Sequence, residues 1–296
     1  MLPKMYVTSL INFQMFRNRT CVRVSSVVSV LRSSKAVSKL GNFLNQIVVI
    51  TGASQGVGKE LAFSFSRMSA VVCLLDIKEG ELQAVNNKIN DEKGRSFAYV
   101  TDVSDSCQVS KTINSIGGQF GKISILINNA GVLSKSLVEE STDDHWKLMI
   151  GVNLMGAVYC SRAAIPYMKE RGGCIINVSS ILGHFPNTGS AAYGVAKGGI
   201  SILTRVLAAE LAPYNIRVNA FSPGVINTPM AEYVIKNRAE SKLKEIALRK
   251  FAEPRDIFNL VKFLCSEESD YITGQTMAID GGIWITQTPT ACWNIE

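Results

Sequence analysis

The chain has 296 residues, of which 47% are hydrophobic and 19% charged, a composition that suits one sizeable globular domain, alone or with an appendage. Its formal net charge of +7 comes entirely from residues 1–44, where seven side chains are basic and none is acidic. Residues 45–296 carry 24 basic and 24 acidic side chains. This neutral body, without a basic cluster interleaved with aromatics, argues against a nucleic-acid partner.

The residues that bind metals or build hydrolase triads are sparse. The chain has two histidines and seven scattered cysteines, with no C-x-x-C pair, so we expect no metal site. Neither histidine lies in a recognisable motif, which disfavours a Ser-His-Asp hydrolase. Cys73 lies in an apolar run and Cys174 opens another, so both are predicted to be core thiols in a reducing compartment.

Residues 1–44 form a basic leader, rich in Ser, Val and Arg, and no acidic residue appears before Glu60. This composition resembles a mitochondrial transit peptide, and a disordered extension or sequence upstream of the true start explains it equally well. We therefore expect a mitochondrial or a cytoplasmic location. No apolar run approaches the roughly 20 residues that cross a bilayer, so no transmembrane segment is predicted.

From residue 46 onward, short apolar runs alternate with longer amphipathic stretches. The runs predict strands over 47–50, 71–76, 96–103, 123–131, 174–180, 216–224 and 276–280. The longer stretches predict helices over 57–68, 81–92, 105–119, 142–170, 193–212 and 254–266. Unbroken apolar strands are typical of a buried parallel sheet, so the pattern predicts one doubly wound α/β domain over 45–284.

Two segments depart from this alternation. Residues 225–251 are charged and contain Pro and Met, which predicts a mobile lid or substrate loop after "SPG". Residues 285–296 follow the last strand as a C-terminal tail.

The first strand leads directly into "TGASQGVG", residues 51–58, ahead of a helix. Glycines there allow a tight turn and a close approach of the backbone to a pyrophosphate, whose charge then lies at the helix N-terminus. The second strand ends at Asp76, where a carboxylate can accept hydrogen bonds from ribose hydroxyls. Strand, glycine turn, helix and terminal acid predict a dinucleotide site that includes Gly52, Ser54, Gln55, Gly56, Val57, Gly58 and Asp76.

The same residues favour NAD over NADP. The Asp76 carboxylate would repel a 2′-phosphate, Ile77 supplies no cation, and Ser54 and Gln55 in the turn are neutral. Lys78 is the exception, because a small backbone shift would bring its amine to such a phosphate.

The stretch "AAYGVAKGG", residues 191–199, places Tyr193 and Lys197 four positions apart on a predicted helix. Positions i and i+4 share a face, so the ammonium can lie beside the phenol and tune its acidity. About half a Y-x-x-x-K match is expected by chance in this composition, so the pair depends on its context.

With these motifs in order, the sequence resembles the short-chain dehydrogenase/reductase family over residues 45–284. The matching pieces are "TGASQGVG", "DV" at 102–103, "NNAG" at 128–131, "VNLMG" around Asn153, "NVSS" ending at Ser180, "YGVAK" at 193–197, "RVNAFSPG" at 217–224 and "ITGQTMAIDGG" at 272–282. The resemblance implies a seven-stranded Rossmann-like fold, a nicotinamide cofactor and hydride transfer between an alcohol and a ketone or aldehyde. It also implies a homotetramer or homodimer, with helices near 156–170 and 193–212 as interfaces.

The resemblance assigns roles to four residues. Tyr193 is the general acid/base, and Lys197 favours its phenolate and binds the nicotinamide ribose. Ser180, thirteen residues before Tyr193, holds the substrate oxygen, and Asn153 helps carry a proton relay. Further cofactor positions implied are Asp102, Val103, Asn129, Gly131, Ile226 and Thr228. His184 and Phe185 follow Ser180 as candidate pocket residues, although we expect His184 to be a surface loop residue.

Two segments differ from the family pattern. Ser69-Ala70 replaces the common Gly-Ala after the first helix, so that helix is expected to end differently. "RKFAEPRDI" at 249–257 replaces a Gly-rich version, which bears on the geometry of the lid.

The sequence thus predicts an NAD-dependent oxidoreductase for a small secondary alcohol or ketone. The alternatives are an NADP-dependent 3-oxoacyl thioester reductase, a steroid or other hydroxy-compound dehydrogenase, and a non-catalytic NAD-binding sensor or scaffold. A sensor would be expected to have substitutions among the four catalytic positions, and this sequence has none.

Overall fold

The computed structural model describes residues 43–294, so nearly all of the predicted leader lies outside the described residues. Its centre is a seven-stranded parallel sheet with the order β3-β2-β1-β4-β5-β6-β7. The strands are β1 Ile47–Thr51, β2 Val71–Asp76, β3 Arg95–Val100, β4 Ile125–Asn128, β5 Gly173–Val178, β6 Ile216–Pro223 and β7 Thr276–Ile279. The predicted doubly wound sheet is confirmed. Its order reverses between β1 and β4, the place where such sheets bind ligands at the carboxyl ends of their strands.

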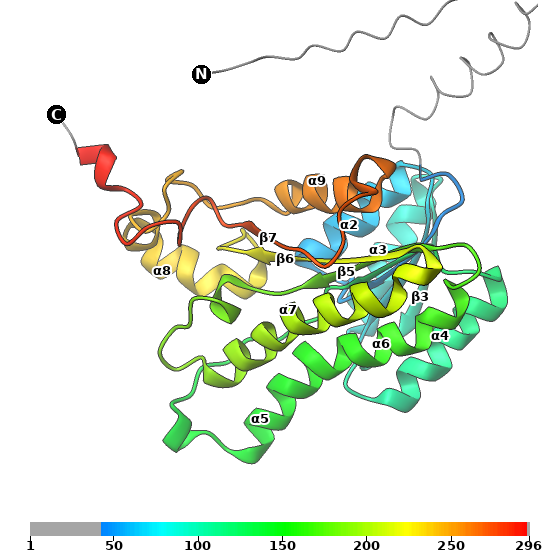
Figure 1. Cartoon of the computed structure of the whole chain (residues 1–296), viewed down its shortest axis with the longest axis horizontal. Helices are drawn as coiled ribbons and strands as arrows, with labels where there is room; N and C mark the ends of the chain where they lie inside the picture. Colours follow the sequence, from blue (N-terminus) through cyan, green and yellow to red (C-terminus); the bar gives the residue numbers. More distant parts are fainter. Residues whose placement is uncertain (1–42, 295–296) are drawn as a thin grey trace, which may run out of the picture. The chain divides into compact units, whose positions relative to one another are not determined.

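Helices cover both faces of the sheet (Figure 1). α2, α3 and α9 pack on one face, whereas α4, α6 and α7 pack on the other. Alternate residues of each strand serve the two cores, since Val48 and Ile50 face the first and Ile47 and Val49 the second. The helices are α2 Gly56–Arg67, α3 Glu79–Asp91, α4 Ser106–Phe120, α5 Asp143–Ile150, α6 Gly156–Ala164, α7 Ala191–Leu211, α8 Glu232–Leu243 and α9 Pro254–Cys265.

The predicted helix over 142–170 consists of α5 and α6 joined by a π-helical turn, Gly151–Met155. The sequence predicted no membrane-spanning segment, whereas Asp143–Tyr167 is long and apolar enough to cross a bilayer by length and composition alone, with a mean hydropathy of 1.4. Cys160 and Ala164 of this stretch are fully buried in the second core. Core packing therefore accounts for part of its apolar character.

The segment predicted as a mobile lid or loop, 225–251, contains helix α8. None of the α8 residues is buried, and ion pairs join Glu232 to Lys236 at 2.5 Å and Glu240 to Lys244 at 2.9 Å along it. A helix without a buried face has no apolar period of 3.6 residues. The loop prediction was incomplete for this reason.

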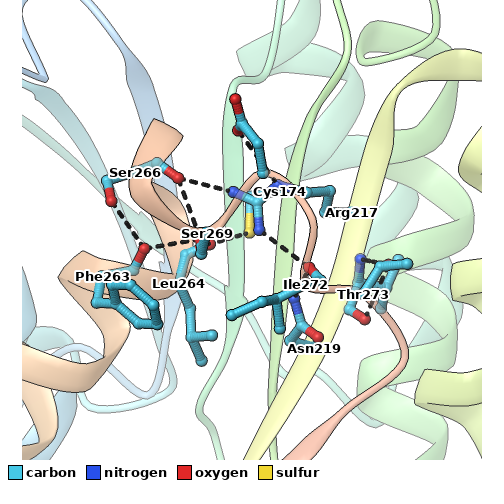
Figure 2. Close-up of polar contacts among 11 residues, drawn as sticks. Cys174, Arg217, Asn219, Phe263, Leu264, Ser266, Ser269, Ile272 and Thr273 are labelled. Carbon is cyan, nitrogen blue, oxygen red and sulfur yellow. Dashed lines mark hydrogen bonds and ion pairs between the residues drawn. The ribbon is translucent and has the colours of Figure 1, made fainter. Parts of the chain in front are cut away.

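Polar contacts of Arg217 fix the connection between α9 and β7 (Figure 2). The guanidinium donates to the carbonyl oxygens of Ser266 at 3.1 Å and Ile272 at 3.3 Å. The side-chain amide of Asn219 also donates to Ile272 O, at 2.8 Å. The two core thiols are confirmed, because Cys73 and Cys174 are buried.

Candidate active site

The glycine turn between β1 and α2 is held tightly against β4. Gly52 has a φ of +67°, and a Cβ there would lie 2.8 Å from the Cα of Ala130. A Cβ on Gly58 would lie 2.0 Å from the Gly52 carbonyl oxygen. The side chain of Asn129 donates to the carbonyl oxygens of Thr51 at 2.9 Å and Gly52 at 3.1 Å. Only glycine suits either position, and the turn brings backbone N–H groups to the N-terminus of α2, where an anion binds well.

Asp76 is fixed at the end of β2 by two backbone donors. Its carboxylate accepts hydrogen bonds from Ser54 N at 3.0 Å and from Lys78 N at 3.1 Å. The ammonium of Lys78 reaches back to the turn and donates to Gln55 Oε1 at 3.3 Å. A carboxylate and an ammonium therefore both lie where the sequence places the adenosine ribose.

A cavity of about 330 Å³ lies along the carboxyl ends of the strands. Most predicted cofactor positions line it: Gly52, Gln55, Gly56, Val57, Asp76, Asp102, Val103, Asn129, Gly131, Tyr193, Lys197, Ile226 and Thr228. Ser54 and Gly58 are absent from this lining, since the N–H of Ser54 supports Asp76 and Gly58 packs against Gly52. The structure brings the predicted nucleotide positions, which span 177 residues of sequence from Gly52 to Thr228, around one hollow.

Several lining residues were not predicted. They include Thr101 just after β3, Val178 at the end of β5, Pro223 at the end of β6, and Met230 ahead of α8. The first three lie at carboxyl ends of parallel strands, which is where ligands bind in such sheets. That rule could have found them from the predicted strands alone.

Tyr193 and Lys197 lie on the first turns of α7, at the inner part of the cavity. Lys197 is 3% exposed, and its ammonium donates to Val178 O at 2.8 Å and lies 5.7 Å from the centroid of the Tyr193 ring. Burial lowers the pKa of Lys197 to about 8. Burial also raises the pKa of Tyr193, and a hydrogen bond from Ser180 opposes that rise.

From the sequence, Lys197 was expected to lower the pKa of Tyr193, and the structure shows a different balance. Burial is the largest influence on the tyrosine, and the hydrogen bond from Ser180 is the opposing one. The lysine ammonium is directed to the carbonyl of Val178 rather than to the phenol oxygen. In this site the hydroxyl keeps its proton more firmly than free tyrosine does.

The structure separates Ser180 from its neighbour Ser179. Ser180 hydrogen-bonds Tyr193, and its hydroxyl oxygen accepts from Leu182 N at 3.2 Å. Ser179 instead donates to Lys197 O at 2.9 Å and lies 3.2 Å from the Ser201 hydroxyl. Ser180 does not line the cavity, and its role in holding the substrate oxygen stays a prediction.

Asn153 lies in the π-helical turn and is 2% exposed. Its amide nitrogen donates to Val132 O and Met149 O, both at 3.0 Å, and its oxygen accepts from Val132 N at 3.2 Å. The side chain therefore ties the segment after "NNAG" to the α5–α6 helix, and it does not line the cavity. Single π turns inside helices are frequent at functional sites.

His184 is exposed in the turn after Ser180, as expected, and it does not line the cavity. Its Nε2 lies 3.0 Å from the Ser201 hydroxyl, and its ring centroid lies 5.2 Å from that of Trp284. Burial lowers its pKa, and Arg205 adds to this. Phe185 is 65% exposed and lies outside the cavity lining.

The chain matches known proteins over almost all of the described fold. A family model described as "Enoyl-(Acyl carrier protein) reductase" matches residues 52–284. A 3-oxoacyl-(acyl-carrier-protein) reductase, FabG, of Thermotoga maritima is 36% identical over 241 residues, which cover 81% of this chain and 98% of that protein. The meso-2,3-butanediol dehydrogenase of Serratia marcescens is 35% identical over 240 residues, covering 81% and 95%. A solved structure, a short-chain type dehydrogenase/reductase from Mycobacterium marinum, has a TM-score of 0.79 and 30% identity, covering 84% of this chain and 99% of that one. The chain belongs to the short-chain dehydrogenase/reductase family.

This family consists of oxidoreductases that bind a nicotinamide cofactor and act on small alcohols and ketones. The glycine turn, the fixed Asp76 and the cavity at the carboxyl ends of the strands fit a dinucleotide. Ser69 marks a difference from the family pattern: it adopts a φ of +65° after α2, where a glycine would be relaxed. The departure changes the end of a helix and leaves the cavity intact.

Proposed function

We propose that this protein transfers hydride between NAD(H) and a small secondary alcohol or ketone, with Tyr193 as general acid/base. One observation carries the proposal: Tyr193 and the buried Lys197 both line the nucleotide cavity, and the Ser180 side chain, just outside the lining, lowers the pKa of the Tyr193 phenol. A hydroxyl pair of this kind can hold one substrate oxygen and exchange a proton with it. Reaction class and proton donor are thereby assigned to one cluster of side chains.

When bound in this cavity, a nicotinamide cofactor would supply or take up the hydride, and the residues below would hold the substrate and move its proton. In ketone reduction the Tyr193 hydroxyl donates its proton to the substrate oxygen, and in alcohol oxidation it takes that proton back. Ser180 donates a second hydrogen bond to the same oxygen and orients it. Lys197, with a pKa of about 8, carries its positive charge at neutral pH and stabilises the phenolate left after proton donation. Asn153 holds the backbone of Val132 at the cavity wall and bonds to Met149 O of α5, as part of the proposed proton relay.

The test of the catalytic role is turnover of a panel of secondary alcohols, ketones and 3-oxoacyl thioesters with each cofactor. We expect Tyr193→Phe to lower kcat about 10²–10⁴-fold, the range that a positioned proton donor supplies. The exposed Tyr271, which is 104% accessible, provides the matched control Tyr271→Phe with unchanged kcat. Unchanged turnover in Tyr193→Phe would remove the assigned role. Cofactor binding without any turnover across the panel would favour the non-catalytic sensor.

The position of Asp76 supports NAD as the cofactor. Its carboxylate is held at the cavity by Ser54 N and Lys78 N, so it cannot readily turn away from a 2′-phosphate. We expect Asp76→Ser to raise the NADPH-to-NADH ratio of kcat/KM by at least about tenfold, because the repulsive group is removed. An unchanged ratio would contradict the assignment.

Lys78 supports the second candidate, an NADP-dependent 3-oxoacyl thioester reductase. Its ammonium already lies 3.3 Å from Gln55 Oε1, across the mouth of the glycine turn. If NADPH is preferred with 3-oxoacyl thioesters, Lys78→Met will reduce that preference. This variant separates the two candidates without touching the catalytic residues.

The outer face of α7 supports a homodimer or homotetramer. Val195, Ile202 and Val206 lie on one face of α7 and are 57%, 58% and 48% exposed. An apolar stripe of this kind is typical of a surface that another chain covers. Light scattering of the purified protein would test this proposal, and a monomer at micromolar concentration would contradict it.

A further inference from the structure

The turn after α8, residues 244–250, has few contacts of its own with the body of the protein. α8 has no buried residue, and its backbone leaves helical geometry at Arg238. In the turn, Ile246 is buried at 2% exposure, and Leu248 N donates to Gly281 O at 3.0 Å. Arg249 adopts a φ of +51°, which a residue other than glycine adopts at a cost. This turn therefore needs additional support to hold one conformation.

The C-terminal tail supplies that support. Thr290 donates its hydroxyl to Lys244 O at 2.6 Å, and the Trp293 indole N–H donates to Ala247 O at 2.9 Å. Both acceptors follow the end of α8, where carbonyl oxygens lack helical partners. The Arg249 guanidinium lies over the Trp293 ring, 5.6 Å from its centroid. In Figure 1 the tail, coloured red, runs beside α8, coloured yellow.

The tail reaches the turn through a close crossing. Gly281 and Gly282 follow β7 with φ values of +65° and +83°, and a Cβ on Gly282 would lie 2.9 Å from the Cβ of Ala247. These two glycines direct the chain across the turn. The family model ends at residue 284, so the contacts of Thr290 and Trp293 come from a part of the chain outside the match.

The other end of the same segment lies at the nucleotide cavity. Thr228, Pro229 and Met230 line the cavity immediately before α8. Farther along, Asn227 N donates to Ala252 O at 2.8 Å and Ala252 N to Val225 O at 3.0 Å, which closes the segment into a loop. Fixing the turn at 244–250 therefore restricts the movement of α8 and, through α8, the movement of Met230.

We propose that Trp293 and Thr290 are positioning residues that fix the turn after α8 and thereby hold Met230 at the wall of the cavity. The consequence for substrate rests on the proposed function: the tail sets the KM for the alcohol or ketone and leaves the proton-transfer residues untouched. The tail is thus a specificity element that this chain adds to the family fold.

The test compares Trp293→Ala, Trp293→Phe and the control Tyr271→Ala in the full-length chain. Hydrogen exchange of the peptide covering 244–250 measures the contact directly, without reference to activity. We expect exchange there to rise about tenfold in Trp293→Ala, since a hydrogen bond and a cation–π contact are lost together. Trp293→Phe keeps the ring and loses the N–H donor, so its rise should be smaller. Tyr271→Ala should match the wild type.

Kinetics test the consequence. With the ketone that the substrate panel identifies, we expect Trp293→Ala to raise KM about three- to tenfold with kcat within about twofold of wild type. Unchanged exchange at 244–250 in Trp293→Ala would overturn the proposal, and so would an equal rise in Tyr271→Ala. Increased exchange with unchanged KM would also overturn it. If the wild type turns over no substrate, the proposed function fails, and the exchange data still decide whether the tail fixes the turn.

Discussion

Replacing the buried Lys197 with methionine should make the protein more stable while abolishing its proposed activity. Lys197 is 3% exposed, and burial lowers its pKa from the ordinary 10.5 to about 8. When folding lowers the pKa of a lysine, burying the charged lysine costs stability. The full cost applies where the lysine is charged in both the folded and the unfolded protein, which here means below about pH 8. At 1.36 kcal/mol per pKa unit, the difference between the ordinary and the buried pKa corresponds to about 3 kcal/mol of stability. Methionine occupies similar space without the charge.

The hydrogen bond that Lys197→Met removes lowers the stability of the variant and so opposes this gain. Lys197 donates to Val178 O at 2.8 Å, and removing the ammonium leaves that carbonyl short of a partner at a cost of about 1–2 kcal/mol. The net gain at pH 7 is therefore about 1–2 kcal/mol. Between pH 8 and 10.5 the unfolded state holds more protons than the folded state, so the wild type regains stability as the pH rises. By pH 9.5 the burial cost is about 1.4 kcal/mol, and the advantage of the variant disappears.

Urea denaturation of both proteins at pH 7.0 and 9.5, without nicotinamide, measures this difference. Burial raises the pKa of Cys73 and Cys160 to about 12, which destabilises both proteins above pH 9 and cancels in the comparison. Lys59→Met, at an exposed lysine on α2, is the control and should change little at either pH. A variant less stable than wild type at pH 7, or a difference that stays constant to pH 9.5, would refute the reasoning.

Three further predictions concern the scaffold, and a fourth concerns a residue near the site. Ser69 has a φ of +65°, so Ser69→Gly should raise the free energy of unfolding by about 1 kcal/mol, and a lowered thermal midpoint would contradict this. Arg217→Met removes two hydrogen bonds, but Ile272 O keeps its donor Asn219 and Ser266 O keeps its donor Ser269, so the variant should destabilise by only about 1–2 kcal/mol in urea. Asp270→Asn should cost less than about 0.5 kcal/mol, because Asp270 is 73% exposed and 3.9 Å from Arg217. His184→Ala should keep kcat within about threefold, since its ring bonds Ser201 outside the cavity lining; a loss above about 100-fold would make His184 part of the catalytic machinery.

The sheet and the nucleotide cavity were predictable because their signals are local in sequence. A strand buried on both faces is a continuous apolar run, and the turn after β1 needs glycine for reasons of backbone space. The carboxyl ends of parallel strands meet at one edge, so order along the chain sets position in the fold. For that reason the sequence pattern assigns Gly52 and Asp76 to one site, whereas Thr228 was implied by the family resemblance.

Other features depend on contacts that a sequence pattern does not carry. α8 was missed because ion pairs and the tail support it rather than a buried apolar face. The π turn around Asn153 follows from how the helix fits between Val132 and its own backbone, a fit set by tertiary packing. For the tail, the sequence predicted only its range, residues 285–296. In the structure, Trp293 contacts a turn 46 residues away.

The electrostatics of Tyr193 and Lys197 illustrate the same limit at the site itself. Their spacing on a helix correctly placed the two groups on one face, and we expected the Lys197 ammonium to favour the Tyr193 phenolate. Burial instead disfavours charge on both: it raises the pKa of the phenol and lowers that of the amine. A neutral Tyr193 beside a lysine that is still protonated at pH 7 is the arrangement that donates a proton to a ketone. Oxidation of an alcohol needs the phenolate, which this burial opposes. Under the proposed function, these protonation states are the ones from which proton donation to a ketone starts, and the burial of the Lys197 charge costs the fold stability.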